Sequence, residues 1–277
     1  MDHQSRSEKP IGVFDSGVGG LSVLRAIRSE LPNEDILYFG DQAHVPYGSR
    51  TLSEVRQLSE GVVHFLLEEA AKLIVVACNT ASAAALHYLR EIFPDVPFVG
   101  MEPAVKPAAE HTHTGRVGIL ATPATFQGEL YASVVERFAQ GVIILQDTCP
   151  GLVGQIEAGR LKTKKTRQIL EQALKPMLAE GIDTVVLGCT HYPFVIPLIK
   201  QIVGPDVQVI DPAPAIARQT IHLLNRDQIA KHGPQLGRLT FFTSADPAAL
   251  HMLLPKLLEE TVPVLGLQWI SDRLVRA

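Results

Sequence analysis

Two similar stretches decide the fold: Leu73-Ile-Val-Val-Ala-Cys-Asn-Thr80 and Thr184-Val-Val-Leu-Gly-Cys-Thr-His191. Each is a short apolar run that ends in a cysteine followed by two hydrogen-bonding residues. Continuous rather than alternating apolar runs are typical of strands that are buried on both faces of a parallel sheet. We therefore expect Cys78 and Cys189 to lie at the carboxyl ends of two buried strands.

The segments around these stretches follow one pattern, in which apolar runs alternate with longer segments at helical spacing. The predicted strands cover residues 10–14, 35–39, 73–77, 97–100, 116–121, 142–146, 184–187, 207–211 and 239–243. The predicted helices cover residues 21–31, 53–72, 82–93, 125–138, 163–180, 194–203, 215–224 and 247–258. This alternation indicates an α/β fold with parallel-rich sheets that are covered on both faces.

The pattern restarts after residue 101, which indicates an internal duplication. Ile11-Gly-Val-Phe-Asp15 resembles Val117-Gly-Ile-Leu-Ala121, and the two cysteine stretches resemble each other at a similar offset. The alternative to a duplication is that these stretches resemble each other only because any two buried strands have similar apolar sequences. We predict two similar doubly wound domains whose sheets face each other across a central cleft. Residues 10–101 with 214–277 form the first domain, residues 102–213 the second, and residues 1–9 a flexible tail.

Composition narrows the class of protein. The 277 residues are 46% hydrophobic and 19% charged, as in globular proteins, and the formal charge of −4 comes without a basic stripe for nucleic acid. The apolar runs are too short for a bilayer, and the polar start of the chain lacks the apolar core of a secretory signal. Three cysteines without a CxxC pair argue against a disulfide framework and a structural zinc site. We expect a cytoplasmic protein with free thiols.

Reactive and polar residues gather where the predicted strands end. Ligands bind outside the carboxyl ends of the strands in open parallel sheets. Asp15 and Ser16, the two cysteine motifs, and Thr122 with Thr125 all follow predicted strands. If the two sheets face each other, Cys78 and Cys189 approach one ligand from opposite sides.

Two opposed thiols suit the inversion of a carbon that bears an acidic hydrogen. A thiolate removes the proton from one face while a thiol delivers a proton to the other, and the two exchange roles in the reverse direction. Helix-starting sequence follows both cysteines, and a helix N-terminus would favour the thiolate. His191 could tune Cys189. A single cysteine after a strand is more often a core residue than a catalyst, and we interpret Cys149 as a core residue. Two cysteines at equivalent points of a duplicated unit, Cys78 and Cys189, instead favour catalysis.

Three loops are candidates for ligand contacts. Asp15-Ser-Gly-Val-Gly-Gly20 could hold a carboxylate or phosphate on its backbone amides, although Asp15 could instead cap the following helix. The loop fits no dinucleotide or Walker motif, which disfavours nucleotide binding. Pro46-Tyr47-Gly48 could present amides to an anion. Glu157, between residues 150 and 159, is either functional or a solvated carboxylate.

Together these motifs resemble the glutamate racemases, within the aspartate/glutamate racemase superfamily. Asp15-Ser-Gly-Val-Gly-Gly20, Pro46-Tyr-Gly48, Cys78-Asn-Thr80 and Cys189-Thr-His-Tyr-Pro193 occur in that family's order, and the likeness runs from about residue 11 to 224. The resemblance implies cofactor-independent interconversion of L- and D-glutamate, without a metal, to supply D-glutamate for peptidoglycan. It also implies two α/β domains with the active site between them.

The resemblance assigns roles to individual residues. Cys78 is implied as the base for D-glutamate and Cys189 as the base for L-glutamate, assisted by Asp15, His191 and Glu157. The implied ligand contacts are Asp15, Ser16, Tyr47, Gly48, Asn79, Thr80, Thr122, Thr125, Thr190 and His191. Gly128 departs from the family, where a small polar residue is more usual. Family members are often homodimers, but no residue pattern in this chain marks an interface.

Other functions remain open at the level of sequence. A racemase of another acidic amino acid, above all aspartate, would use identical chemistry, and kinetics with both substrates would decide between them. A two-lobed amino-acid binding protein would have a similar outline, but it would not need paired thiols. A cysteine hydrolase would need one nucleophile with a histidine base and would leave the second cysteine without a role.

Overall fold

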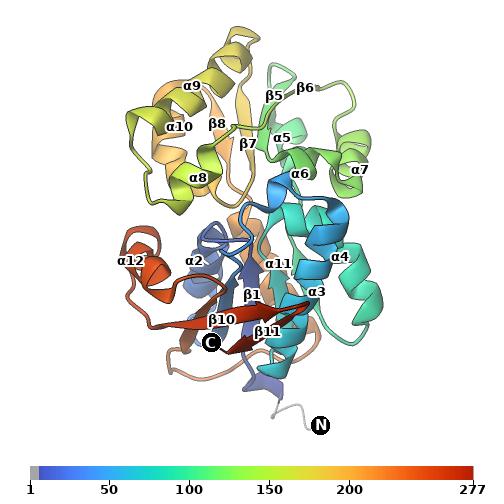
Figure 1. Ribbon diagram of the computed structural model, residues 1–277. Helices are drawn as coiled ribbons and strands as arrows, with labels where there is room; N and C mark the ends of the chain where they lie inside the picture. The colour runs from blue at the N-terminus through green and yellow to red at the C-terminus, as the bar shows by residue number, and fades with distance from the viewer. Residues whose placement is uncertain (1–5, 277) are drawn as a thin grey trace.

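The computed structural model describes residues 6–276 as two α/β units, each built around its own sheet (Figure 1). The larger sheet contains β1 (Ile11–Asp15), β2 (Ile36–Gly40), β3 (Leu73–Val76), β4 (Phe98–Gly100), β9 (Leu239–Thr243), β10 (Val264–Ile270) and β11 (Arg273–Arg276). The smaller sheet contains β5 (Arg116–Ala121), β6 (Ile143–Asp147), β7 (Thr184–Gly188) and β8 (Gln208–Ile210). All strand pairs are parallel except β10 with β11, so the prediction of an α/β fold with parallel-rich sheets is confirmed.

The two sheets repeat one strand order. The larger sheet runs β11-β10-β9-β2-β1-β3-β4 and the smaller runs β6-β5-β7-β8. Strands β1 to β4 therefore correspond in order to β5 to β8, and the larger sheet adds three strands beside β2. The register agrees: Ile11 pairs with Leu73, and Val117 pairs with Thr184. These four residues begin the stretches that resemble each other in the sequence, which supports the duplication.

Helices connect the strands and cover both sheets. They are α2 (Leu21–Glu30), α3 (Leu52–Glu68), α4 (Asn79–Ile92), α5 (Val105–His111), α6 (Pro123–Gln127), α7 (Glu129–Phe138), α8 (Leu152–Glu157), α9 (Lys164–Ala179), α10 (Ile196–Val203), α11 (Ala213–Arg226) and α12 (Pro247–Leu257). Two short 3₁₀ helices, η1 (Tyr47–Ser49) and η2 (Tyr192–Val195), add to them. Among residues 6–276, no helix has the length and apolar character needed to cross a membrane.

Strand β1 shows how the larger sheet is buried. Ile11 and Val13 belong to an apolar cluster with α2 and α11, whereas Phe14 belongs to another cluster with α3 and α4. Successive side chains of a strand point to opposite faces, so both faces of this sheet are covered. The first cluster continues into the second unit through Leu187 and Cys189 of the β7 segment. The two units therefore share apolar packing next to the strand ends.

Several predicted elements differ from the observed ones. The helix predicted over 125–138 is two helices, because Gly128 is extended, with φ −72° and ψ 139°. A Cβ at Gly128 would meet the Cβ of Ala83 at 2.6 Å, so this glycine lets α6 and α7 pack closely on α4. The sequence interpretation did not include α5, α8 or the β10–β11 hairpin. The α4 helix begins at Asn79 rather than at residue 82, which places Cys78 at its N-cap.

The positions of the helices and strands do not test the predicted domain boundaries or the predicted tail, so both stay predictions. The strands of the larger sheet come from residues 11–100 and 239–276, and those of the smaller sheet come from residues 116–210. Residues 1–5 of the predicted tail lie outside the described residues. Residues 6–9 form a helical turn, and the Ser7 carbonyl in it accepts a 2.6 Å hydrogen bond from Lys72.

Candidate active site

Cys78 and Cys189 line the same small cavity between the two sheets. Cys78 follows β3 and Cys189 follows β7, the corresponding strand of the other sheet. The residues that line the cavity are Ser16, Pro46, Tyr47, Gly48, Cys78, Asn79, Thr80, Thr122, Val153, Cys189, Thr190 and His191. The volume open to the centre of a water molecule is about 10 Å³, roughly the room for one water. We call this arrangement closed, because the volume is too small for a ligand as large as an amino acid.

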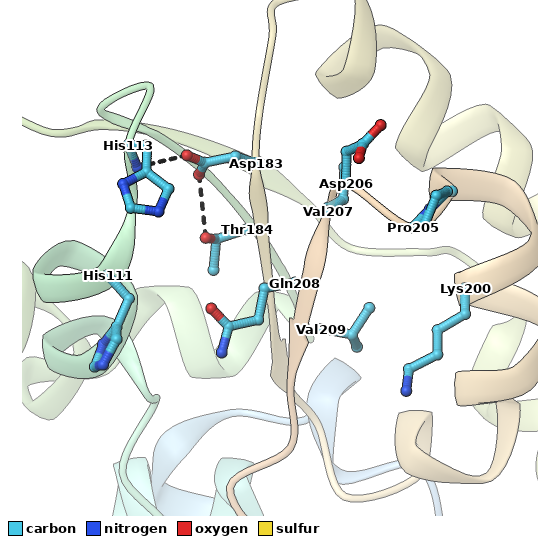
Figure 2. A pocket seen from close by; sticks show the side chains of 11 residues that line it. His111, His113, Asp183, Thr184, Lys200, Pro205, Asp206, Val207, Gln208 and Val209 are labelled. Carbon is cyan, nitrogen blue, oxygen red and sulfur yellow. Dashed lines mark hydrogen bonds between the residues drawn. The ribbon is translucent and has the colours of Figure 1, made fainter.

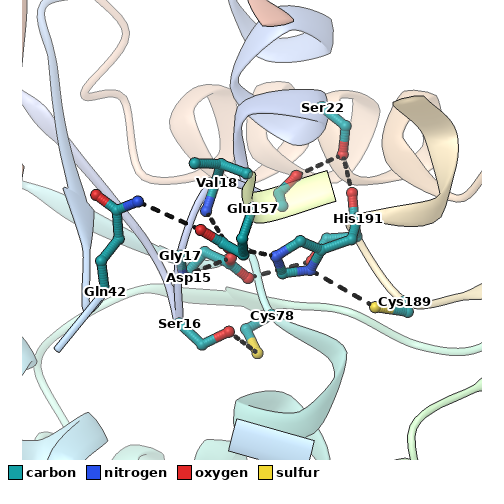
Figure 3. A network of polar contacts seen from close by, with 12 residues as sticks. Asp15, Ser16, Gly17, Val18, Ser22, Gln42, Cys78, Glu157, Cys189 and His191 are labelled. Carbon is teal, nitrogen blue, oxygen red and sulfur yellow. Dashed lines mark hydrogen bonds and ion pairs between the residues drawn. The ribbon is translucent and has the colours of Figure 1, made fainter. Parts of the chain in front are cut away.

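A relay of polar groups lies behind Cys189 (Figure 3). His191 Nδ1 lies 3.7 Å from the Cys189 sulfur, and His191 Nε2 lies 2.6 Å from Glu157 Oε1. Burial alone would lower the pKa of His191, but contacts with Cys189 and Glu157 outweigh it and raise the pKa well above its ordinary value. The imidazole is therefore protonated at neutral pH, beside the sulfur.

Glu157 also joins the two units. It ends α8 of the smaller unit, and its Oε1 accepts a 2.8 Å hydrogen bond from Val18 N in the loop after β1. Its other oxygen accepts a 3.3 Å bond from Gln42 Nε2. The position of the His191 ring thus depends on contacts from both units.

The surroundings of Cys78 are different. Its sulfur lies 3.9 Å from the Ser16 hydroxyl and accepts a 3.4 Å hydrogen bond from Ala81 N, as the N-cap of α4. We expected the helix N-terminus to favour a thiolate here. The Ala81 amide at the helix N-terminus does lower the pKa of Cys78, but burial, helped by the nearby Asp15 carboxylate, outweighs it and raises the pKa well above its ordinary value. Cys78 is therefore a thiol.

Asp15 lies fully buried at the end of β1. It accepts hydrogen bonds from Gly17 N at 2.9 Å and from the Thr190 hydroxyl, in the other unit, at 3.1 Å. Burial raises its pKa, against the opposing effect of His191 and the Gly17 amide. The alternative that Asp15 caps the next helix is wrong, since the N-cap of α2 is Gly20, without a side-chain cap.

The remaining polar wall of the cavity holds hydroxyls and an amide. The Thr80 hydroxyl lies 2.9 Å from that of Thr122, which lies 3.0 Å from that of Thr125. The Asn79 side chain is buried, and neither its nitrogen nor its oxygen has a hydrogen-bond partner among the described residues. An unpaired buried amide costs about 1–3 kcal/mol, which a ligand with both donors and acceptors would recover.

Gly48 packs closely against Thr122 of the smaller unit. A Cβ added to Gly48 would meet the Cβ of Thr122 at 2.6 Å, so the close approach of the η1 turn to the N-cap of α6 requires glycine. The neighbouring Tyr47 is buried, and its hydroxyl donates a 2.6 Å hydrogen bond to Asp41. Burial, together with Asp41, raises the pKa of Tyr47 well above its ordinary value, so the hydroxyl stays protonated.

Most of the residues predicted from the sequence meet at this cavity. Asp15, Thr125 and Glu157 lie just behind its lining and contact lining residues. The sequence interpretation did not select Pro46 or Val153 as site residues. Pro46 lies within a quoted motif, but Val153 is an ordinary apolar residue with no signal of function. Cys149 is buried outside the lining, as its interpretation as a packing residue requires.

A larger cavity, of about 750 Å³, lies away from the cysteines (Figure 2). It opens where β7 and β8 begin, with Thr184 and Gln208 in its lining, whereas ligands of parallel sheets bind where strands end. The oxygens of Asp183, one of its acidic residues, are already hydrogen-bonded by Thr112, His113 and Thr114. Within residues 6–276 no group of three or more His, Cys, Asp or Glu side chains could hold a metal ion.

Comparison with known proteins agrees with this geometry. A model of the Asp/Glu/Hydantoin racemase family matches residues 11–220. The chain belongs to this family. A glutamate racemase of Pseudomonas paraeruginosa is 51% identical over 246 residues, which cover 89% of this chain and 92% of the relative. The chain is an amino-acid racemase of the glutamate racemase type, as the sequence motifs predicted.

Two solved relatives have the same fold and carry ligands. The glutamate racemase of Francisella tularensis in complex with D-glutamate has a TM-score of 0.82 and 29% identity, with 96% of this chain and 98% of that chain covered. The Escherichia coli glutamate racemase in complex with L-glutamate and the activator UDP-MurNAc-ala also has a TM-score of 0.82, with 34% identity and 96% and 99% covered.

Proposed function

We propose that this racemase interconverts L- and D-glutamate without a cofactor, with Cys78 and Cys189 as its two proton carriers. The observation that carries the proposal is the placement of the two sulfurs, which end corresponding strands of two facing sheets and line one closed cavity. The solved relatives with L-glutamate and with D-glutamate support glutamate as the substrate.

The two cysteines start in different protonation states when L-glutamate binds. Cys189 is assigned as the base for L-glutamate, because the His191 imidazole lies 3.7 Å from its sulfur and the family resemblance implies this role. Burial keeps Cys78 protonated, so it is the acid. The Cys189 thiolate takes the α-proton, the electron pair stays on the α-carbon, and Cys78 delivers its proton to the opposite face.

This step leaves Cys78 as thiolate and Cys189 as thiol, which is the starting state for D-glutamate. The reverse reaction then uses the same groups with their roles exchanged. Asp15 lies beside Cys78 and His191 beside Cys189, so each sulfur has a titratable neighbour through which it can exchange protons after product leaves. Glu157 keeps His191 charged.

The lining suits a substrate that can make many hydrogen bonds. It contains neither Lys nor Arg, and its polar groups are hydroxyls, the Asn79 amide and His191. We propose that Asn79, the threonine hydroxyls and the amides near Ser16 and Gly48 bind the two carboxylates and the ammonium group. An aspartate racemase would use the same chemistry with a shorter side chain, and turnover of aspartate equal to that of glutamate would favour that alternative.

We further propose that the protein works in the cytoplasm and supplies D-glutamate for peptidoglycan. A two-thiol mechanism requires a compartment that keeps cysteines reduced, and all three cysteines are free.

The experiment replaces each cysteine by alanine. Cys78→Ala and Cys189→Ala are each expected to reduce racemisation by at least about 10³-fold, measured by circular dichroism from either enantiomer. In deuterium oxide, Cys78→Ala still exchanges the α-hydrogen of L-glutamate only, and Cys189→Ala that of D-glutamate only, measured by proton NMR.

Cys149→Ala is the matched control, because it deletes a buried thiol outside the cavity lining and is expected to keep wild-type rates. Full racemisation by either single variant would refute the two-thiol mechanism. Exchange of the opposite enantiomer by each variant would refute the assigned roles.

A further inference from the structure

The carboxylate of Asp41 joins three separate segments of the chain. Asp41 follows β2 and is completely buried. Its Oδ2 accepts a 2.6 Å hydrogen bond from the Tyr47 hydroxyl. Its Oδ1 accepts bonds from the Ser244 hydroxyl at 2.6 Å and from Trp269 Nε1 at 2.8 Å, and His44 Nδ1 lies 3.0 Å from Oδ2. The hydrogen bonds from these four side chains outweigh burial and lower the pKa of Asp41, so it is ionised.

Two of these donors come from the C-terminal part of the chain, beyond the repeated strand pattern. Ser244 follows β9, and Trp269 lies in β10 of the terminal hairpin. The hairpin packs on α3 at Gly61, where an added Cβ would meet the Trp269 ring at 2.7 Å and the Asp272 carbonyl oxygen at 2.5 Å. This glycine is therefore required for Trp269 to come close enough to reach Asp41.

The third donor, Tyr47, belongs to the cavity. Residues 46–48 line it directly, and Gly48 packs against Thr122 of the other unit. Gln42, the next residue after Asp41, makes a second connection between the C-terminal part of the chain and the site. It accepts a 2.9 Å hydrogen bond from the Thr243 hydroxyl and donates a 3.3 Å hydrogen bond to Glu157. The C-terminal segment thus reaches both the 46–48 loop and the carboxylate behind His191.

We propose that the C-terminal segment is part of the active-site scaffold, with Trp269 and Ser244 as positioning residues that hold the 46–48 loop through Asp41. This inference rests on the proposed function, in which that loop binds glutamate. A charged hydrogen-bond acceptor shared by four side chains fixes the Tyr47 hydroxyl, and hence the backbone of Gly48, before substrate binds. Loss of a donor weakens substrate binding more than it slows proton transfer, because neither sulfur contacts this cluster in the hydrogen bonds described.

The test is a set of conservative variants assayed with both enantiomers. Trp269→Phe keeps the ring and loses only the N–H donor, and Ser244→Ala loses only a hydroxyl. Each is expected to raise KM for L- and for D-glutamate about tenfold, with kcat changed less than about twofold. Ile270→Thr, at the exposed neighbouring position of the same strand, is the control and is expected to behave as wild type.

A double-mutant cycle separates positioning from mere folding of the hairpin. If Trp269 acts through Asp41, Trp269→Phe has no further effect on KM in an Asp41→Asn background. If it acts independently, the two effects multiply, which would overturn the proposal. Should Asp41→Asn not fold, the cycle between Trp269→Phe and Ser244→Ala replaces it, because both donors bind the same oxygen and their effects are expected to be less than multiplicative.

Two further readouts complete the design. Trp269 is the only tryptophan in the chain, so its emission shows whether the hairpin stays docked in Asp41→Asn and Ser244→Ala. An unchanged KM in Trp269→Phe, or a loss confined to kcat, would refute the positioning role. Wild type and Ile270→Thr must racemise glutamate in the same assay. If they do not, the proposed function fails, whereas normal activity of these two together with normal KM in Trp269→Phe refutes only the role of the hairpin.

Discussion

Gly48→Ala tests whether the reaction requires the closed arrangement of the two units. The new Cβ would lie 2.6 Å from the Cβ of Thr122, 2.9 Å from its Cγ2 and 3.0 Å from its Oγ1. Carbon atoms in ordinary contact are about 3.5–4.0 Å apart, so Thr122 must retreat by about 1 Å. The Cβ of Thr122 is attached directly to the backbone, so a side-chain rotation cannot relieve this contact. The backbone, and with it the gap between the two units, has to move.

That displacement has a predictable cost. The 2.9 Å contact between the Thr80 and Thr122 hydroxyls would stretch beyond hydrogen-bond distance. A misplacement of about 1 Å can reduce an enzymatic rate about 100-fold, equivalent to about 3 kcal/mol of transition-state stabilisation. We therefore expect Gly48→Ala to lower kcat/KM for glutamate racemisation about 100-fold in both directions, measured by circular dichroism. Far-ultraviolet circular dichroism would show a folded protein.

Gly154→Ala is the matched control, because it adds the same methyl group in α8 of the smaller unit. Nothing lies within 4 Å of a Cβ at Gly154. It is expected to keep wild-type kinetics and to add roughly 0.5–1 kcal/mol of stability, since alanine favours a helix over glycine. Wild-type kcat/KM in Gly48→Ala would refute the reasoning that contact between Gly48 and Thr122 sets the reactive geometry.

Two other predictions concern ionisable groups. Glu157→Gln removes the carboxylate that helps raise the pKa of His191. As pH rises, the variant is therefore expected to lose the activity that needs the imidazolium at a lower pH than wild type does. An unshifted pH profile of kcat/KM would exclude this role for Glu157. Asp183 has a pKa of about 2. Partial burial would raise this pKa, but hydrogen bonds from Thr112, Thr114 and His113 hold it below the ordinary value of 3.8. The contribution of Asp183 to stability is therefore present above pH 3.8 and lost as pH falls toward 2. After allowance for solvent screening, Asp183→Asn is expected to cost about 1 kcal/mol in urea unfolding at pH 7 and much less near pH 2, and an equal cost at both pH values would contradict the charge as its cause.

Much of the fold could be predicted because its signals are local. Continuous apolar runs such as 73–77 and 184–187 reflect burial on both sheet faces, which the sequence records directly. The hairpin of β10 and β11 was missed because its burial is partial and irregular along the strand, without a clean alternation of apolar residues. The break at Gly128 was missed because a glycine within a helical pattern does not reveal its backbone angles, and close packing on Ala83 decides them.

The sequence by itself determined the two cysteines, their equivalent places in a duplicated unit and the inversion chemistry that such a pair suits. Only the tertiary structure decided how unlike their surroundings are. Cys78 is a buried thiol near Ser16 and Asp15, whereas Cys189 lies beside a charged His191 held by Glu157. The physical reason is that protonation states depend on burial and on charges brought together across both units. Residues 139 positions apart, such as Val18 and Glu157, meet only when the chain has folded.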